Sequence, residues 1–547
     1  MKRLLAAILG ATLLTSLGCG GGSRQGASSS TPASPSTEAP HRGGNVVIGT
    51  LSDIQNWNPY LSETALADDV LALLYPTLAV EQVDYREHPP SFKPNLASSW
   101  ELSADGLSLT FHLRRNAVWS DGVPVTSDDV VYSYRVRTSP EVGWEVEALA
   151  EKISSVEAVD EHTVRFRFTH RYPYQLMDVN DGPIIPIHAW RSIPVARWER
   201  VDWRKHALSA GPFRLLSSTP QQGFVLVRNE RFWDPKLPYL DRVVWRVVPD
   251  QVNLLNQLRT GEIDFMQGIP PREAEAVRAD PRLQLIHFAD RTYGYLGWNT
   301  RNPLFRDPRV RRALTMAIDR QSILDSVMRG FARPAVGPVL STMWAFNRNL
   351  RPLPYDLDRA RRLLAEAGWL DSDGDGALDR AGKPFAFELI TNAGNEIRED
   401  ICQMVSDQLS RVGIRVTPRF IEWGTMLSRL EHGTFDAYVS AWREGTQVDL
   451  APVWHSAKPG EATYNYVGYA NPEVDRLIDQ LRKHESFTDQ KPDLDRIQVI
   501  IHRDQPYTFL YQGERVAGLN KRVKNAVIND GTPYFNLDEW YVVSSPR

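Results

Sequence analysis

Cysteine is nearly absent from this sequence. The 547 residues include only two, Cys19 and Cys402, so no disulfide framework is available to hold the fold together. Cys402 lies in a stretch with helical periodicity, and a lone interior cysteine is most often a small buried hydrophobic residue. Stability must therefore come from packed cores, and the roughly 500 residues from Asn45 onward are enough for two or more of them.

Strong charge of one sign is also lacking. The 63 Lys and Arg residues nearly balance the 67 Asp and Glu residues, and the formal net charge of −4 is spread without long runs of like charge. We therefore expect no nucleic-acid partner.

Common catalytic motifs are missing as well. The chain contains no His-Glu-x-x-His, Gly-x-Ser-x-Gly or P-loop pattern, so three frequent routes to hydrolysis or phosphate binding have no support. Its 12 histidines are scattered rather than paired at metal-ligand spacing. We expect a protein that is not an enzyme and that has no cofactor, apart from a possible structural calcium ion.

The one long apolar run stands at the N-terminus. Residues 1–17 begin with Lys2 and Arg3 and continue almost wholly apolar, but the run is too short for a comfortable membrane span. A basic head, an apolar centre and small residues at the end predict a signal peptide for export over residues 1–18. A short transmembrane anchor is the alternative.

The end of that run resembles the lipobox of bacterial lipoproteins, because it reads Leu17-Gly18-Cys19. The resemblance implies that Cys19 becomes the mature N-terminus and carries the lipid, so that acyl chains anchor the protein. Residues 19–44 are rich in Gly, Ser, Thr, Pro and Ala. Such a composition buries too little apolar surface to fold and predicts a flexible tether.

Periodic patterns predict a mixed α/β protein. Alternating residues at 107–113 predict a strand between turns at Asp105-Gly106 and Asp121-Gly122. Thr126 to Asp128 then form an N-cap and acidic first turn for a helix. Farther along, strands at 385–391, 416–420 and 435–441 alternate with a helix at 397–409, which predicts a partly parallel sheet in the second half.

An amphipathic helix is predicted near the middle of the chain, where Val310, Leu314 and Ala317 share one face. Three arginines, Arg309, Arg311 and Arg312, accompany it. We expect them to form a solvated face rather than a phosphate or nucleic-acid patch.

Motifs in fixed order identify a family resemblance. Four segments carry it: Pro94–Trp100 as P-x-L-A-x-S-W, Asp105–Arg114 as D-G-L-x-x-T-F-x-L-R, Trp119–Val130 as W-S-D-G-x-P-V-T-x-D-D-V, and Asp307–Arg320 as D-x-R-V-R-x-A-L-x-x-A-I-D-R. Together they resemble the solute-binding proteins of peptide and nickel ABC importers. The resemblance covers essentially everything from Asn45 to the C-terminus.

The resemblance implies an α/β fold with two lobes, like that of periplasmic binding proteins of type II, in the large cluster with an extra subdomain in the first lobe. Lobe 1 is expected at 45–292, with the subdomain at about 80–205, and lobe 2 at 293–508. Residues 509–547 are expected to return to lobe 1. The two crossovers of the hinge are expected near 290–293 and 506–510.

The implied function is capture of a small ligand between the lobes and delivery to a membrane permease and its ATPase. The protein would be an exported, lipid-anchored monomer facing the periplasm or cell exterior. Oligopeptides or dipeptides are the leading ligands, and a metal complex, an opine or an oligosaccharide stays open. Two contrasting hypotheses are a hydrolase on a similar scaffold and a receptor that signals to a membrane sensor.

Ligand contacts are carried over from the family by position. Together with the neighbouring tyrosines, they give a set of twelve candidates: Asn56, Glu63, Thr64, Trp144, Asn395, Arg398, Trp442, Arg443, Glu444, Asp449, Tyr464 and Tyr466. The two tyrosines, with Trp57, Trp144, Trp298, Trp442 and Trp454, lie in or beside predicted loops. Such aromatic surface suits a binding cleft, and packing in cores is about as good an explanation for any single tryptophan.

Peptide-binding members hold the ligand's amino terminus with an aspartate shortly after a Gly-Trp pair. A carboxylate is needed there because an ammonium removed from water must be paired. The matching stretch here is residues 441–449, which has Ala441 in place of glycine and lacks the usual Asp-Pro. Glu444 and Asp449 are both candidates for an amine anchor, whereas Arg443 could attract an acidic group.

One acidic stretch resembles a calcium loop. Asp371, Asp373, Asp375 and Asp379 alternate at positions 1, 3, 5 and 9, and Gly376 occupies position 6. Position 12 is Gly382 instead of the bidentate glutamate. We expect a solvated Asp/Gly turn, with weak calcium binding as the alternative.

Overall fold

The computed structural model describes residues 39–62, 64–142, 149, 151–456 and 463–543. The predicted signal peptide, Cys19 and most of the predicted tether lie outside these ranges, as do Glu63 and Trp144. Within the described ranges, no helix combines the length and apolar character that crossing a membrane requires.

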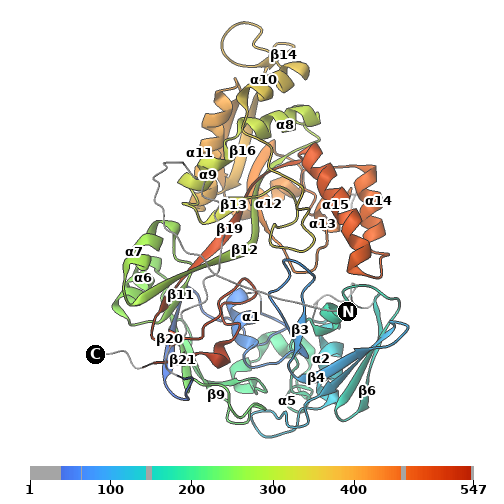
Figure 1. Cartoon of the computed structure of the whole chain (residues 1–547), viewed down its shortest axis with the longest axis vertical. Coiled ribbons are helices and arrows are strands. Elements are labelled where there is room, and N and C mark those ends of the chain that lie inside the picture. The colour runs from blue at the N-terminus through green and yellow to red at the C-terminus, as the bar shows by residue number, and fades with distance from the viewer. Residues whose placement is uncertain (1–38, 63, 143–148, 150, 457–462, 544–547) are drawn as a thin grey trace, which may run out of the picture. The chain divides into compact units, whose positions relative to one another are not determined.

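A large mixed sheet runs through both lobes (Figure 1). Its main path has the order β17 (Arg415–Ile421), β16 (Ala386–Asn392), β18 (Ala437–Arg443), β12 (Leu283–Trp298), β19 (Tyr507–Asn520), β11 (Phe265–Gln267), β1 (Asn45–Thr50), β10 (Arg242–Val247), β9 (Gly223–Arg228) and β8 (Phe213–Thr219), and β13 (Ala332–Pro334) pairs with β19 outside this path. Pairing is parallel for β1 with β10 and β11, and for β16 with β17 and β18. The partly parallel sheet predicted for the second half is therefore confirmed.

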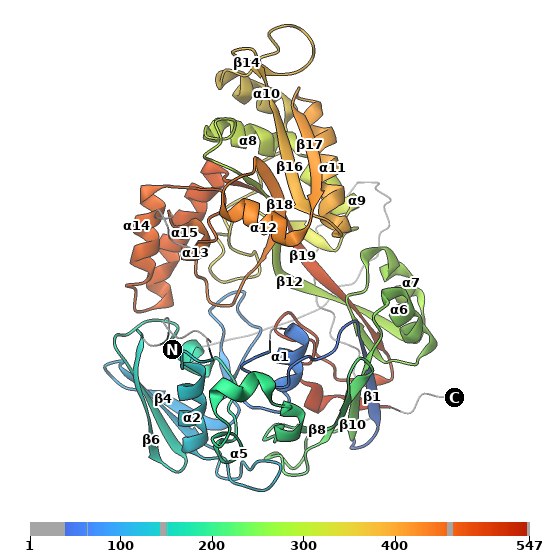
Figure 2. The same cartoon turned by 180° about the vertical axis from the view of Figure 1, so that it is seen from behind.

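Two long strands, β12 and β19, connect the lobes (Figure 2). Their antiparallel pairing changes register between Ala289, which faces Glu514, and Tyr293, which faces Gln512. We call residues 289–293 and 512–514 the hinge. The pairing thus places residues 512–514 opposite residues 289–293. Just past the hinge Gly294 lies under the ring of Tyr511, where a Cβ atom would be 2.2 Å from a ring carbon.

The first lobe contains one end of this sheet and a separate four-stranded sheet in the order β4 (Ala97–Leu102), β5 (Ser108–Leu113), β7 (Thr163–Phe168) and β6 (Ile153–Asp160). Residues near the C-terminus belong to the same core: Tyr534 and Trp540 are buried with Val46 and Trp245, and the indole N–H of Trp245 donates to the hydroxyl of Tyr534 at 3.0 Å. Three short strand pairs complete the described sheets: β2 (Ala79–Glu81) with β3 (Phe92–Pro94), β14 (Asp379–Arg380) with β15 (Lys383–Pro384), and β20 (Val523–Lys524) with β21 (Tyr541–Val542).

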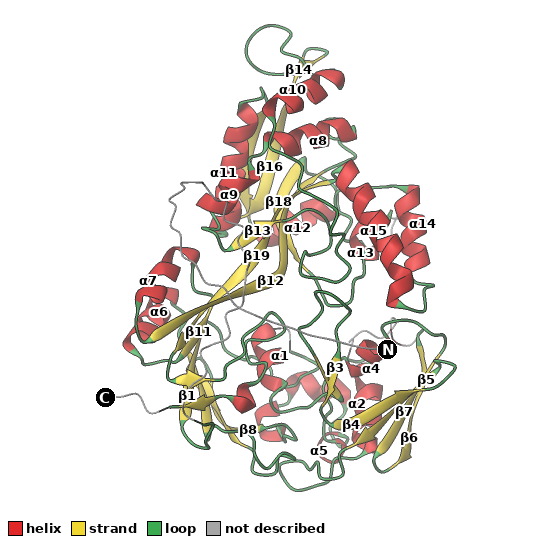
Figure 3. Ribbon diagram, in the orientation of Figure 1, coloured by secondary structure: helices red, strands yellow, loops and turns green. Residues whose placement is uncertain are grey.

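Helices surround the sheets (Figure 3). Those of the first lobe are α1 (Ala65–Leu71), α2 (Ser127–Arg137), α4 (Gln175–Asn180), α5 (Ile187–Trp190), α6 (Gln251–Thr260) and α7 (Ala274–Ala279), with 3-10 turns η1 (Val195–Arg200), η2 (Trp203–His206), η3 (Pro271–Glu273) and η4 (Leu537–Glu539). Those of the second lobe are α8 (Pro308–Ala317), α9 (Arg320–Ser326), α10 (Leu357–Glu366), α11 (Glu396–Ser410), α12 (Trp423–Glu431), α13 (Ala451–Trp454), α14 (Pro472–Leu481) and α15 (Phe487–Asp504). Cys402 is buried within α11, as predicted.

The predicted cap of α2 explains part of the motif at 119–130. Thr126 and Asp129 form a capping box at its N-terminus. The buried carboxylate of Asp129 accepts hydrogen bonds from the backbone N–H groups of Thr126 at 2.8 Å and Ile187 at 2.9 Å. One side chain thus joins two segments of the first lobe, and the motif serves the scaffold.

The prediction of a solvated arginine face is wrong for Arg311. Its side chain is only 4% exposed, and its guanidinium donates to the carbonyl oxygens of Phe305, Arg306, Asp504 and Gln505 at 2.7 to 3.2 Å. Helical periodicity could not reveal these acceptors, because two of them lie more than 190 residues away in the chain.

Replacing Arg311 by methionine should lower the free energy of unfolding by about 3 kcal/mol, because several buried carbonyl groups lose their donor. The matched control is Arg309→Met on the same helix, since Arg309 is exposed and its closest partner is Asp307 at 2.7 Å. That change should cost under about 1 kcal/mol. Urea denaturation followed by tryptophan fluorescence measures both, and equal effects would contradict the structural role.

Candidate functional site

The end of β18 carries the main group of predicted ligand contacts. In the ladder with β12, Trp442 faces Tyr293 and Arg443 faces Thr292. One more backbone hydrogen bond follows, from the N–H of Glu444 to the carbonyl of Arg291 at 2.7 Å. Glu444 is therefore fixed beside the hinge. We call Trp442–Asp449 the binding segment.

The carboxylate of Glu444 has no hydrogen-bond or ion-pair partner among the described residues. Burial raises its pKa from near 4.5 to about 7, and the charge of Asp449 adds to the shift. Nearby, the hydroxyl of the buried Tyr293 also has no partner in the described part of the chain. An unpaired acid beside an unpaired hydroxyl is chemically suited to a donor that carries positive charge.

Three predicted aromatic contacts lie together at the same place. The ring centroids of Trp442 and Tyr464 are 5.8 Å apart, and Trp442 stacks with Tyr466 at 6.2 Å. Behind them, Tyr295 and Tyr507 stack at 4.0 Å, and the indole N–H of Trp442 donates to the hydroxyl of Tyr507 at 3.4 Å. Tyr464 is 55% exposed, so it extends this aromatic group to solvent.

The other tryptophans considered as cleft residues lie in cores, apart from Trp144, which falls outside the described ranges. Trp57, Trp298 and Trp454 are all at most 3% exposed. Trp57 packs against Phe224 of the first lobe, and the indole of Trp298 donates to Thr508 at 3.0 Å. For these three, the explanation by core packing is correct.

Arg443 faces acidic groups that sequence reasoning missed. Its charge acts on Asp69 of helix α1, as does the charge of Arg515. Burial nevertheless raises the pKa of Asp69 to about 7. Arg515 in turn pairs with Asp290 of the hinge at 3.0 Å. Charged side chains of helix α1 and of the hinge thus lie close to the binding segment.

A second charged group lies on the other side of the hinge. The guanidinium of Arg291 is 4.0 Å from the carboxylate of Asp530, and that carboxylate also accepts a hydrogen bond from Tyr85. Burial raises the pKa of Glu81, although a hydrogen bond with Thr446 of the binding segment opposes the shift. Sequence spacing gave no signal for these residues, since Tyr85 and Asp530 are 445 positions apart.

The remaining predicted contacts take part in local structure. Thr64 caps α1 by accepting from Ala67 at 3.3 Å, and Asn395 caps α11 by accepting from Arg398 at 3.1 Å. Arg398 also donates to Asn392 at 2.7 Å. Asn56 accepts from the N–H of Asn58 and lines a hollow formed by first-lobe segments, including residues 199–204 and 218–221. The structure does not bring Asn56 together with the aromatic group.

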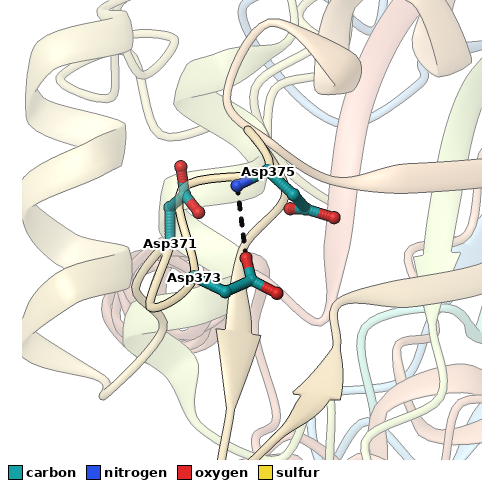
Figure 4. A group of neighbouring side chains, drawn as sticks. All are labelled: Asp371, Asp373 and Asp375. Atoms are coloured by element: carbon teal, nitrogen blue, oxygen red, sulfur yellow. Dashed lines mark hydrogen bonds between the residues drawn. The ribbon is translucent and has the colours of Figure 1, made fainter.

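The acidic loop between α10 and β14 groups three of its four predicted ligands. Carboxylate oxygens of Asp371, Asp373 and Asp375 lie within 4.8 Å of one another (Figure 4). Asp379 is not in this group, because its carboxylate accepts from the N–H and hydroxyl of Ser372 at 3.0 and 2.6 Å. The loop is held by its own bonds, among them two from backbone N–H groups of Gly374 and Gly376 to Asp371.

Comparison with known proteins decides the family. The model of bacterial extracellular solute-binding proteins, family 5 (middle part), matches residues 91–464. The chain belongs to this family. The family consists of binding proteins and not enzymes, so the expectation that this chain is not an enzyme is confirmed.

Relatives of this solute-binding protein bind different ligands. The oligopeptide-binding protein AppA of Bacillus subtilis is 30% identical over 521 residues, which are 94% of each chain. Its structure in complex with a nonapeptide has a TM-score of 0.73 and covers 92% of this chain and 100% of that one. Heme-binding protein A of Haemophilus influenzae is 26% identical over 490 residues, 84% of this chain and 86% of that one.

The fold is confirmed by further solved structures. CtaP of Listeria monocytogenes is only 23% identical, yet its structure has a TM-score of 0.79 and covers 92% of this chain and 100% of that one. The predicted α/β fold with two lobes is therefore correct for this solute-binding protein.

Replacing Glu444 by glutamine should stabilise the ligand-free protein at alkaline pH. A raised pKa in the folded state means that the stability tied to the bound proton is present below about pH 4.5 and is lost as the pH rises through about 7. At pH 8 the variant should be more stable by about 2 kcal/mol, and the two proteins should agree at pH 4. Urea denaturation across this range provides the measurement, with the exposed Glu366→Gln as control. A constant difference at all pH values would be inconsistent with the buried acid.

Calcium should stabilise this solute-binding protein only slightly. With three carboxylates in the group and an affinity typical of weak extracellular sites, about 2 mM calcium would add about 1 kcal/mol. The double change Asp371→Asn and Asp373→Asn should abolish the effect, whereas Asp379→Asn should retain it, because Asp379 is bonded to Ser372. Differential scanning calorimetry with calcium and with a chelator tests this, and a shift that persists in the double variant would argue against the site.

Proposed function

We propose that this protein captures a peptide between its lobes and delivers it to an ABC permease. The carboxylate of Glu444 carries the proposal, since it is half-buried beside the hinge and has no partner among the described residues. A peptide's amino terminus supplies the ammonium that such a carboxylate needs. The likeness to an oligopeptide-binding protein at 30% identity supports the ligand class.

Glu444 is the amine anchor in this proposal, rather than Asp449. The side chain of Asp449 accepts a hydrogen bond from the N–H of Ala451 at 3.0 Å, and the residue is exposed. Its charge still contributes by keeping a second negative group near Glu444. A carboxylate that is desolvated discriminates more strongly between charged and neutral ligands than one in water.

The aromatic group binds the part of the ligand next to the amine. Trp442, Tyr464 and Tyr466 give rigid apolar surface at little cost in conformational entropy. Tyr464 is exposed enough to gain contact area when a ligand arrives. We infer a preference for an apolar or aromatic side chain near the peptide's amino terminus.

Non-peptide ligands form the second candidate class, and one observation favours them. The related protein of Haemophilus influenzae is named for heme binding, and a broad aromatic surface also suits a flat ligand. A metal complex, an opine or an oligosaccharide belongs to the same class. Arg443 would contribute by attracting an acidic ligand group, although Asp69 and Arg515 already act on its surroundings.

The cellular setting is part of the proposal. We propose that the chain is exported, that Cys19 carries the lipid anchor, and that residues 19–44 tether the lobes to a membrane facing the periplasm or the cell exterior. The monomeric protein would then meet a permease and its ATPase, without a nucleic-acid partner. Mass spectrometry of the mature N-terminal peptide tests the anchor directly.

The amine contact should give peptide binding a characteristic pH dependence. Affinity should rise as the pH rises through about 7, because Glu444 must lose its proton, and fall above about 8, where the peptide amine is neutral. Glu444→Gln should weaken binding about a hundredfold and flatten the rise. Asp449→Asn should cost much less.

Isothermal titration with an alanine pentapeptide, free or acetylated at its amino terminus, measures this contact. Acetylation should weaken binding to the wild type about as much as Glu444→Gln does, and it should have little further effect on the variant. Equal binding of both peptides by the wild type would refute the anchor. Native mass spectrometry of the purified protein with its captured ligand separates peptides from non-peptide ligands.

A further inference from the structure

The binding segment is bonded to the opposite lobe as well as to its own. The side-chain N–H of Gln447 donates to the carboxylate of Asp178 at 2.7 Å, and the backbone N–H of Val448 donates to the hydroxyl of Tyr174 at 3.3 Å. Tyr174 and Asp178 belong to the start of helix α4 in the first lobe. Two adjacent residues of the second lobe thus contact two residues on one turn of a first-lobe helix.

The first-lobe side of this contact is held firmly. Asp178 is only 5% exposed, and its other carboxylate oxygen pairs with Lys152 at 3.1 Å. With Lys152 on one oxygen, the second is left for Gln447. Gln447 must direct its amide N–H toward Asp178, because an ionised carboxylate only accepts hydrogen bonds.

Tyr174 is likewise held by packing. Its ring meets that of Phe487 edge-to-face at 4.9 Å, and Phe487 contacts Trp344 at 5.3 Å. Phe487 and Trp344 belong to the second lobe, so the tyrosine ring lies against it while its hydroxyl serves the binding segment. The hydroxyl and the ring of Tyr174 therefore both stabilise the contact between the two lobes.

We propose that Tyr174, Asp178, Gln447 and Val448 form a latch between the lobes, in which Gln447 is a positioning residue for ligand binding. The ligand part of this inference rests on the proposed function; the contact between the lobes does not. Gln447 and Val448 stand between Glu444 and Asp449 in sequence. At no more than about 3.6 Å per residue, the backbone of Gln447 lies within about 11 Å of the Glu444 backbone.

The latch makes the shape of the binding segment depend on closure. When the lobes are together, backbone bonds to Arg291 at one end and to Tyr174 farther along fix the segment at two points. When they separate, the second point is lost and the segment keeps only its own lobe's contacts. A separate bridge, from the N–H of Trp344 to the carbonyl of Tyr85 at 2.7 Å, does not touch the segment. Together with the hydrogen bond between Glu81 and Thr446, the latch thus links closure to the proposed ligand anchor.

Reversing the polarity of the Gln447–Asp178 bond tests the latch. Gln447→Glu sets two carboxylates against each other, so small-angle X-ray scattering of the ligand-free protein should show a larger radius of gyration. Affinity for an alanine pentapeptide should fall about tenfold. Adding Asp178→Asn supplies an amide donor for the new glutamate, and the double variant should recover the wild-type radius and come within about threefold of its affinity.

Controls separate the latch from a general loss of stability. Asp178→Asn alone keeps an acceptor oxygen for Gln447 and should leave the radius unchanged, with its melting temperature reporting the lost Lys152 pair. Tyr174→Phe keeps the ring on Phe487 and should weaken binding about threefold. Gln321→Ala, an exposed glutamine on α9 bonded to Asp325, should change nothing.

Two results would overturn the latch. The first is a radius of gyration that does not change in Gln447→Glu. The second is a double variant, Gln447→Glu with Asp178→Asn, whose radius of gyration is as large as that of Gln447→Glu although the two variants are equally stable. Failure of the proposed function looks different. If no alanine peptide binds the wild type but the polarity reversal still opens and recloses the ligand-free protein, the peptide proposal fails and the latch stands.

Discussion

The pairing of β12 with β19 is the constraint on which the rest of the structure depends. These two strands run through the large sheet of both lobes. The hydrogen-bond ladder between them is continuous except near the hinge. Because Asp290, Arg291 and Thr292 bulge opposite the chain near Gly513, bending there breaks fewer ladder bonds than bending elsewhere. Motion of the lobes is thereby directed to the place where the binding segment begins, since Glu444 is bonded to Arg291.

Charge around the hinge works against stability and, under the proposed function, in favour of binding. Glu444 and Asp69 both have pKa values raised to about 7 by burial, which is the mark of carboxylates that lack a sufficient partner. A scaffold selected for stability alone would replace or pair them. Residues that break local rules in this way are concentrated where function requires it, and here they are on both sides of the hinge. A neighbouring carboxylate, that of Asp290, does have an ion-pair partner, Arg515 at 3.0 Å.

Local patterns predicted the elements well, because capping and alternation act over a few residues. The cap by Thr126 and Asp129 is an example. Arg311 shows the limit of such reasoning: its helix was predicted, but two of its four acceptors lie at the end of α15. In the site, Trp442 and Glu444 could be found from a motif, whereas Asp69, Tyr174 and Asp178 could not. Those three reach the binding segment only through the fold, across more than 260 residues for the last two.

The placement of latch and anchor on one segment has a consequence for selectivity. Under the proposed anchor and latch, a ligand that engages Glu444 would gain full affinity only if the lobes also closed far enough for Gln447 to reach Asp178. A ligand too large for closure would keep the amine contact and lose the latch. The protein would therefore select its ligand by size and by charge in the same step. The number of residues between Glu444 and Gln447 therefore matters as much as their identity. A change in loop length here would alter selectivity while both side chains remain in place, which is the kind of variation that separates relatives sharing one fold.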